Sequence, residues 1–453
     1  MIRHARYLLA LAPLLITACN DSSGSGGPSG PYPNVQFVHA SPDAPAVSVR
    51  IDGQLFLDEL DYAEGTGEIS LPPGSHTLEV DALNPAGPTP VIGPVTVSFA
   101  QNTDYVVVAE GPVASIAPVT FPHPLSAVAA ANTRVQVLHA APAAGPVAVY
   151  VTAPGASLAS STPLDGGPLA YQAGVGPTDI PAGTYEIRIT PANATAPVLF
   201  DSGTVTFNGG DDLVITALQN TGPGASPVFL GMVSAGGYSW ICWDVATPAN
   251  VRVVHDVADA PAVSIVADGN TATPLVASLV YEGSTAYLPL TPGAHTLGIT
   301  AAPATGTSTV LASRSLNLDV GSEQTVYAFG KLATLSEGVT WDNRRRIATE
   351  AKLRIIHGAP SAGNVDIYVT AHGAGIATAT PTYPNIPFGG DSWFQGFAAG
   401  SYDVTVTPTG AKTAAIGPAQ VTLANSGVYT AVARDAPNGG APYGLILLDD
   451  FLP

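Results

Sequence analysis

Charged side chains are scarce in this sequence of 453 residues. Asp, Glu, Lys and Arg make up 11% of it, which argues against long helices with ion-paired faces. The 15 lysines and arginines are outnumbered by 34 acidic residues and form no dominant basic face. Because affinity for phosphate comes from clustered cations, we do not expect nucleic acid as a partner.

Enzyme motifs are also missing. The sequence contains no Gly-x-Ser-x-Gly elbow, no His-Glu-x-x-His pair, no phosphate-binding glycine loop and no cysteine in the setting of a nucleophile. We therefore expect a protein that is not an enzyme and that uses no cofactor. A β-sandwich can bear an active site on its loops, so a hydrolase stays as a third hypothesis behind the two given below.

Long hydrophobic runs are confined to the beginning of the sequence. Arg3, His4 and Arg6 precede an apolar run of 11 residues, Tyr7–Thr17, which is too short for a resident transmembrane helix. A basic start followed by such a run is typical of a secretion signal. No later segment approaches the roughly 18 uninterrupted apolar residues of a membrane span.

The apolar run ends in Ile16-Thr17-Ala18-Cys19, which resembles the bacterial lipobox. The resemblance implies cleavage before Cys19 and attachment of diacylglycerol to its sulfur, and Asn20 at the sorting position implies delivery to the outer membrane. An ordinary signal peptide with an incidental cysteine is the alternative. We predict a signal peptide at residues 1–18, then the lipidated cysteine and a flexible tether at 19–33.

Cysteine is otherwise represented by Cys242 alone. With Cys19 acylated, no intramolecular disulfide can form. Cys242 lies between two tryptophans in "SWICWD", so we expect a small buried residue rather than a nucleophile.

Glycine and proline are abundant, at 48 and 42 residues, and they punctuate a pattern that occurs four times. Each copy opens with a short apolar run that ends in a histidine, and a valine begins the next run eight positions later. The histidines are His39, His139, His255 and His357, and the valines are Val47, Val147, Val263 and Val365. His39 and His255 are 216 residues apart, and His139 and His357 are 218 apart, which indicates a two-repeat unit duplicated whole.

Each repeat offers about seven short runs of alternating apolar residues between Gly, Pro and Asp-Gly turn signals, as in an immunoglobulin-like domain. We predict an all-β protein of four tandem immunoglobulin-like antiparallel β-sandwich modules, at residues 34–128, 132–235, 249–340 and 351–453. We expect partly packed junctions between modules, with Arg344, Arg345 and Arg346 facing carboxylates next door.

The repeated histidine continues the apolar face of the opening strand, because residues two apart share a face. A proline follows in three repeats and starts a loop whose backbone groups lose their sheet partners. We predict that the imidazoles hold these loops. A metal ligand or general base in each repeat is the alternative, but one histidine per repeat lacks the three or four converging ligands of a zinc site. No metal site is predicted.

Two acidic residues lie in the loops after the histidines. Asp43 and Asp259 occupy equivalent positions in the first and third repeats, where the second and fourth carry Ala143 and Ser361. We interpret both carboxylates as turn caps. Cation binding is the alternative, and it would require several convergent oxygens.

The first and third repeats carry the openings "VQFVHASPDAPAVSVRIDG" and "VRVVHDVADAPAVSIVADG", followed by "PPGSHTLEV" and "TPGAHTLGI". These stretches resemble the domain of unknown function 4397 family. The second and fourth repeats keep the histidine and the paired strands and diverge between them. The resemblance covers nearly all of the chain after the tether. It implies a surface location and a sandwich-like architecture, as in other secreted or anchored members, and it implies no activity.

We expect a non-enzymatic lipoprotein, held in the outer membrane through Cys19, whose sandwiches form a structural or interaction array of the cell envelope. The alternative is an adhesin or binding module that takes an extracellular glycan or a divalent cation on loops at the sandwich ends. Trp393 in "GGDSWFQG" is the glycan candidate, because sugars stack on exposed aromatic rings, and Asp43 and Asp259 are the cation candidates. The expected partners are the membrane and a cell-envelope protein or an extracellular glycan.

Overall fold

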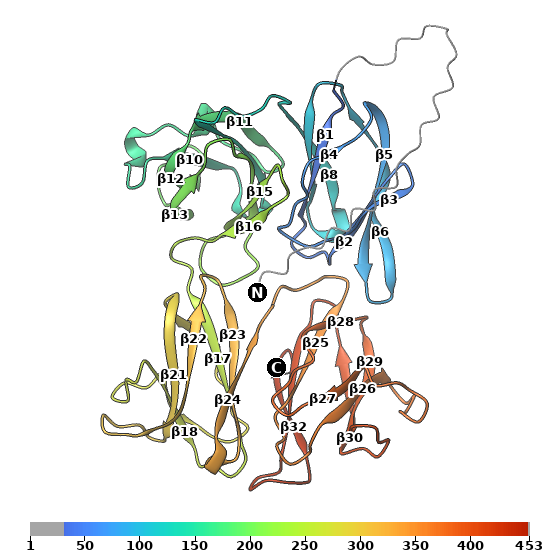
Figure 1. Ribbon diagram of the computed structural model, residues 1–453, viewed down its shortest axis with the longest axis vertical. Helices are drawn as coiled ribbons and strands as arrows, with labels where there is room; N and C mark the ends of the chain where they lie inside the picture. The colour runs from blue at the N-terminus through green and yellow to red at the C-terminus, as the bar shows by residue number, and fades with distance from the viewer. Residues whose placement is uncertain (1–30, 452–453) are drawn as a thin grey trace.

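A computed structural model describes residues 31–451. Cys19 and the predicted signal peptide lie outside the described residues. The described chain is built from short strands and one-turn 3-10 helices, and its strands form eight sheets that the chain visits in four consecutive groups (Figure 1). The all-β sandwich prediction is confirmed.

In the first sandwich, two four-stranded sheets face each other across a core that includes Val35, Phe37 and Phe99. Its first sheet contains β4 (Ile69–Ser70), β1 (Asn34–Ala40), β7 (Asp104–Glu110) and β8 (Ala117–His123), in that order. Its second sheet contains β3 (Gln54–Leu60), β2 (Val47–Ile51), β5 (Gly74–Asn84) and β6 (Gly87–Phe99), and η1 (Val113–Ser115) follows β7.

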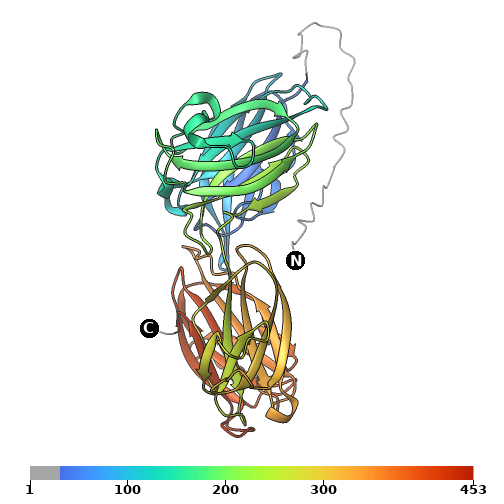
Figure 2. The ribbon, with the colours of Figure 1, turned by 90° about the vertical axis from the view of Figure 1, so that its left-hand side faces the viewer.

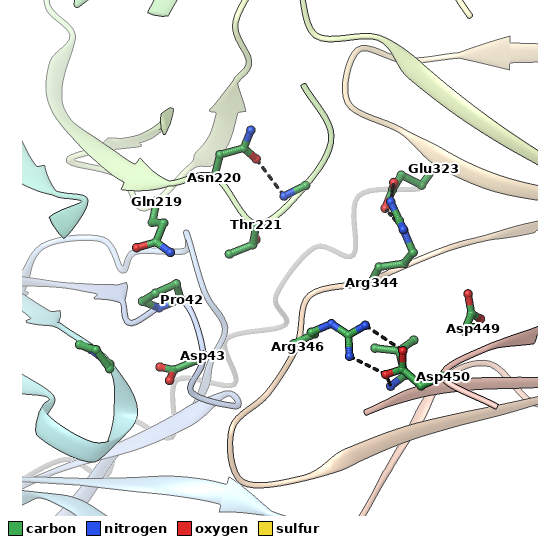
Figure 3. A pocket seen from close by; sticks show the side chains of 13 residues that line it. Pro42, Asp43, Gln219, Asn220, Thr221, Glu323, Arg344, Arg346, Asp449 and Asp450 are labelled. Carbon is green, nitrogen blue, oxygen red and sulfur yellow. Dashed lines mark hydrogen bonds and ion pairs between the residues drawn. The ribbon is translucent and has the colours of Figure 1, made fainter. Parts of the chain in front are cut away.

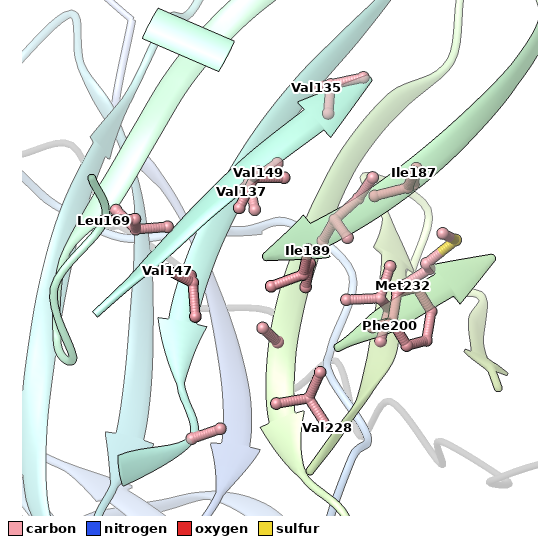
Figure 4. Close-up of a cluster of buried hydrophobic side chains, with 14 of the residues drawn as sticks. Val135, Val137, Val147, Val149, Leu169, Ile187, Ile189, Phe200, Val228 and Met232 are labelled. Carbon is pink, nitrogen blue, oxygen red and sulfur yellow. The ribbon is translucent and has the colours of Figure 1, made fainter. Parts of the chain in front are cut away.

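The second sandwich has a larger first sheet and a smaller second one. Five strands form the first: β11 (Gly174–Pro181), β9 (Asn132–Ala140), β14 (Asp212–Gln219), β15 (Val228–Ser234) and β16 (Ser239–Cys242). Three form the second: β10 (Val147–Thr152), β12 (Gly183–Pro191) and β13 (Phe200–Phe207). The 3-10 helices are η2 (Pro142–Ala144), η3 (Leu158–Ser160) and η4 (Leu164–Gly166). Valine, isoleucine and leucine side chains from both sheets, with Phe200 and Met232, fill the core (Figure 4).

The third sandwich returns to two sheets of four strands. These are β20 (Leu288–Leu290), β17 (Ala249–Val257), β23 (Glu323–Gly330) and β24 (Ser336–Trp341), facing β19 (Val276–Leu279), β18 (Val263–Ala267), β21 (Gly293–Ala301) and β22 (Val310–Leu318). A single 3-10 turn, η5 (Leu332–Thr334), follows β23.

The fourth sandwich has the same arrangement as the first and third. It contains β28 (Gln395–Phe397), β25 (Ala351–His357), β31 (Val428–Arg434) and β32 (Gly444–Asp449), facing β27 (Tyr383–Ile386), β26 (Val365–Ala371), β29 (Gly400–Pro408) and β30 (Ile416–Leu423).

Each sandwich contains one parallel strand pair within its otherwise antiparallel sheets. The opening strand runs parallel to the strand beside it in the pairs β1 and β7, β9 and β14, β17 and β23, and β25 and β31. The chain leaves the first sheet after its opening strand, builds the second sheet and then returns, and such a crossover permits parallel pairing.

The sandwiches pack in pairs, the first on the second and the third on the fourth (Figures 1 and 2). The outer faces of their first sheets meet in separate hydrophobic clusters. One contains Val38 and Val108 of the first sandwich with Leu138 and Leu218 of the second, and the other joins Val254, Tyr327 and Phe329 to Ile356, Val432 and Leu448. The opening strands are therefore buried on both faces, one in their own core and one in the pair interface.

Candidate functional site

The four repeated histidines end or nearly end their opening strands, and all are buried. In the first repeat, the backbone N–H of Ser41 donates to His39 Nδ1 at 3.2 Å, which leaves the proton on Nε2. His39 Nε2 then donates to the carbonyl oxygen of Pro45 at 3.0 Å. Burial lowers the pKa of His39 to about 4, so the ring is neutral near neutral pH.

The same link recurs in every repeat, always between the ring and the carbonyl six residues later. The Nε2 to oxygen distances are 2.7 Å for His139 and Gly145, 3.2 Å for His255 and Pro261, and 2.6 Å for His357 and Gly363. Burial lowers the pKa of each of these three rings as well. In the fourth repeat, His357 Nδ1 has no hydrogen-bond partner among the described residues.

An aromatic ring that was not predicted from the sequence packs edge-on against each histidine. The pairs are His39 with Tyr62, His139 with Tyr171, His255 with Tyr281 and His357 with Phe388, at centroid distances of 6.3, 6.3, 6.1 and 6.2 Å. The backbone N–H of the residue after each ring donates to the carbonyl oxygen of the histidine. A glycine follows each of these rings within three residues, but glycine is too frequent in this chain, at 48 residues, to identify the pairing.

These aromatic residues also reach the neighbouring sandwich. The Tyr62 hydroxyl donates to the carbonyl oxygen of Gln219, and the Tyr281 hydroxyl donates to that of Asp435, both at 2.7 Å. Phe388 packs against Phe329 of the third sandwich at 4.8 Å between ring centroids. The loops beside the histidines therefore form part of the pair interfaces.

The loop aspartates of the first and third repeats, Asp43 and Asp259, make equivalent hydrogen bonds. Asp43 Oδ1 accepts from the backbone N–H of Val113, and Asp259 Oδ1 accepts from that of Leu332, both at 2.7 Å. Each carboxylate thus ties the loop after the histidine to the 3-10 helix that follows the parallel strand pair. Within residues 31–451, no group of three or more His, Cys, Asp and Glu side chains is placed to hold a metal ion.

Trp393 lies just before β28 and is 60% exposed. Its backbone has a positive φ of 56°, and its N–H donates to Asp391 Oδ1 at 3.0 Å. The neighbouring Phe394 ring lies under the guanidinium of Arg354 at 4.3 Å, so it is occupied by an intramolecular cation–π contact. The structure brings Trp393 together with neither Asp43 nor Asp259, which lie in the first and third repeats.

Cys242 ends β16 and is partly buried. Burial raises the pKa of its thiol to about 11, which opposes formation of the nucleophilic thiolate.

The three arginines between the third and fourth repeats each meet a carboxylate, as the sequence predicted. Arg344 pairs with Glu323, Arg345 with Asp61 and Arg346 with Asp450. Arg345 makes the longest-range connection: it joins the first sandwich, where it also donates to the carbonyl oxygen of Ala44 at 2.6 Å.

A cavity of about 800 Å³ lies where the two pairs of sandwiches meet (Figure 3). It is lined by residues of all four repeats, including Asp43, Asn220, Glu323 and Asp450. The charged groups inside it are largely paired with one another: Arg344 bonds Glu323 and Arg346 bonds Asp450. On the other side of the junction, the Trp243 ring lies on Gly321 of the third sandwich, where an added Cβ would come within 2.5 Å of the ring.

No helix in the described part of the chain has the length and apolar character needed to cross a bilayer.

Solved structures and one family model show similarity to this chain. Among curated proteins, none matches this sequence. Two of the solved structures that resemble the chain are each 12% identical to it. The match to the Bacillus anthracis TIE protein covers 91% of this chain and 76% of that protein, with a TM-score of 0.16. The match to a putative cell adhesion protein from Bacteroides fragilis covers 71% of this chain and 92% of that protein, with a TM-score of 0.12.

One family model matches twice, at residues 33–150 and 249–368. Each match begins at the first or third repeat and ends soon after the opening strands of the next repeat, in agreement with the 216-residue spacing of His39 and His255. The two matches together cover more than half of the sequence, and the chain belongs to the family described as "Domain of unknown function (DUF4397)".

Proposed function

We propose that the protein is a non-enzymatic lipoprotein, anchored in the outer membrane through Cys19, whose packed sandwiches act as a structural or interaction element of the cell envelope. The observation that carries the proposal is the hydrogen bonding of the repeated polar side chains. All four histidines hydrogen-bond to their own loops, and the two loop aspartates accept from the backbone of the 3-10 helices η1 and η5. A catalytic side chain would instead keep a functional atom directed at a cleft.

The interfaces between sandwiches support the same function. Two hydrophobic clusters join the sandwiches into pairs, and Arg345 and Trp243 connect one pair to the other. Apolar interfaces of this kind resist relative movement of domains. A stiff body that follows the tether predicted at residues 19–33 suits a protein that spaces or presents a surface outside the membrane.

The anchor is tested by comparing the full chain with its Cys19→Ser variant in a Gram-negative host. We expect the wild-type chain to incorporate labelled palmitate and to sediment with outer-membrane vesicles, whereas the variant does neither. Protease digestion of intact cells then reports whether the sandwiches are exposed. A wild-type chain that stays unlabelled, or that fractionates with the cytoplasm, would contradict the proposal.

The envelope role is tested in the native host by deleting the gene. We expect the deletion to raise sensitivity to detergent or to abolish attachment to a surface, and the wild-type chain to restore the phenotype while Cys19→Ser does not. Full rescue by Cys19→Ser would show that anchoring is irrelevant to the function.

A further inference from the structure

The second sandwich has a strand for which the other three have no counterpart in the described part of the chain. Its first sheet contains five strands, whereas the corresponding sheets contain four, and the additional strand is β16. β16 pairs antiparallel with β15, with Trp240 opposite Met232. Trp240 and Cys242 pack against the edge of the second core. The "SWICWD" segment therefore builds a structure that no other repeat contains.

A groove of about 430 Å³ lies at this edge, between β16 and β13. Trp240 and Trp243 line it from one side and Thr204, Thr206 and Phe207 from the other. None of its lining residues is charged, although the whole chain has a formal net charge of -19. Its volume falls in the roughly 300–1,000 Å³ range of small-ligand sites. An uncharged ligand suits such a groove, because no ionic group would lose its water without a partner.

An aromatic surface continues from the groove to the outside. The Tyr238 side chain is 58% exposed, and its ring lies 5.5 Å from that of Trp240 with an interplanar angle of 33°. Ile241 and Val245 are exposed beside the groove as well. Exposed apolar side chains gathered in one place on a protein surface commonly mark a binding site.

Threonine residues line the groove on the β13 side. Thr204 and Thr206 are both exposed. A threonine hydroxyl both donates and accepts, so it can match a ligand that carries many hydroxyl groups. Aromatic ring faces provide apolar contact for the C–H face of such a ligand.

We propose that the groove between β13 and β16 binds a neutral carbohydrate, with Trp240 and Tyr238 as the stacking rings and Thr204 and Thr206 as hydrogen-bonding groups. The proposal rests on the proposed function, in that it gives the envelope-anchored array a ligand. It places glycan binding in the second repeat rather than at Trp393. The Trp393 side chain is exposed, but the ring of its neighbour Phe394 already makes a cation–π contact with Arg354.

An extended peptide added to the edge of β13 is less compatible with the structure. Strand addition requires a free backbone edge. The segment after β16 already occupies the start of that edge: the backbone N–H of Val245 donates to the carbonyl oxygen of Asp201 at 2.8 Å, and Asp244 Oδ2 accepts from the N–H of Asp201.

The test is titration of the full chain, in detergent, with cellotetraose, maltotetraose and chitotetraose, followed by tryptophan fluorescence and calorimetry. We expect at least one of these neutral probes to bind and Trp240→Ala to weaken it by about tenfold or more, the loss of one stacking contact. Thr204→Val with Thr206→Val should also weaken binding, and this variant leaves the core side chains intact if Trp240→Ala misfolds. The matched control is Trp393→Ala, with unchanged affinity.

Three results would overturn the proposal: no binding of any neutral probe, binding that survives both groove variants, or displacement of the sugar by a Val-Thr alternating heptapeptide, which would assign the groove to strand addition. The sugar-binding experiment and the envelope experiments can fail independently of each other. If the wild-type chain binds sugar but is not lipidated, only the proposed membrane anchor is wrong. If it is lipidated but binds no sugar, only the proposed binding groove is wrong.

Discussion

His39 is linked to Pro45 by a hydrogen bond of 3.0 Å from imidazole Nε2 to the backbone carbonyl oxygen, within a fully buried environment. The equivalent link is present in all four repeats and spans the loop that leaves the first sheet. A buried backbone carbonyl that loses its donor costs free energy of the order of a lost hydrogen bond.

Replacing one of these histidines should destabilise its sandwich. We expect His139→Phe to lower the free energy of unfolding by about 2–4 kcal/mol, because the partly buried Gly145 carbonyl oxygen and the buried Ala141 N–H both lose their partner. Denaturant titration monitored by circular dichroism measures the change. The control is His372→Phe, whose side chain is 53% exposed and which should change stability little. Equal effects of the two substitutions would contradict the loop-holding role.

A buried carboxyl group should make stability fall as pH rises. Glu110 ends β7 at the pair interface, is fully buried, and neither of its carboxylate oxygens has a hydrogen-bond partner among the described residues. Burial raises its pKa to about 8 from 4.5. Between these two pH values the unfolded chain has lost a proton that the folded chain keeps, so the folded state loses stability as pH rises through this window.

Glu110→Gln removes this dependence. We expect the variant to be more stable than the wild type at pH 8 by roughly 2–4 kcal/mol and indistinguishable from it near the acidic end of the window. Thermal unfolding at a series of pH values measures the difference, with the exposed Glu59→Gln as the control. A stability gain that does not vary with pH would mean that the burial of charge is not its cause.

Arg345 should determine how the two pairs of sandwiches are held together. Its guanidinium reaches from the linker before β25 to Asp61 and to the carbonyl oxygen of Ala44 in the first sandwich. We expect Arg345→Ala to increase the radius of gyration in small-angle X-ray scattering, because one of the contacts between the pairs is lost. Arg346→Ala is the matched control, since Arg346 pairs with Asp450 on its own side of the junction. A profile that is the same for both variants would show that Arg345 does not restrain the junction.

Calcium should leave stability unchanged. A ligand specific for the native state raises the unfolding midpoint by mass action. Asp43 and Asp259 already accept backbone N–H groups, and within residues 31–451 neither belongs to a group of three or more side chains that could hold a metal ion. We expect equal thermal midpoints in EDTA and in millimolar calcium, and Asp43→Ala to lower the midpoint equally in both. A midpoint that rises with calcium in the wild type and not in Asp43→Ala would restore the cation-binding alternative.

Much of the fold could be predicted because it depends on neighbours along the chain. Strand alternation places Val35, Phe37 and His39 on one face, and the structure buries that face in the first core. The three linker arginines were expected to meet carboxylates because they are exceptional in an acidic chain, and each does.

The aromatic partners of the histidines were not predicted. Tyr62 lies 23 residues after His39, whereas Tyr171 lies 32 residues after His139, so no constant spacing reveals the pairing. The ring becomes recognisable only when the loop folds back to hydrogen-bond the histidine backbone. The groove at β16 was missed for a similar reason, since β13 and β16 belong to different sheets.

The repeats, the strand periodicity and the family can be recognised without a structure, because each is a property of residues close together or of a pattern that recurs. Three features emerge only on folding: the contact of Val38 with Leu138 in a pair interface, the ion pair of Arg345 with Asp61, and the uncharged groove beside Trp240. These contacts join surfaces far apart in the chain. The outer face of a sheet has the same local sequence whether it meets water or a second sheet, so which face is covered follows from the shape of the folded sandwiches.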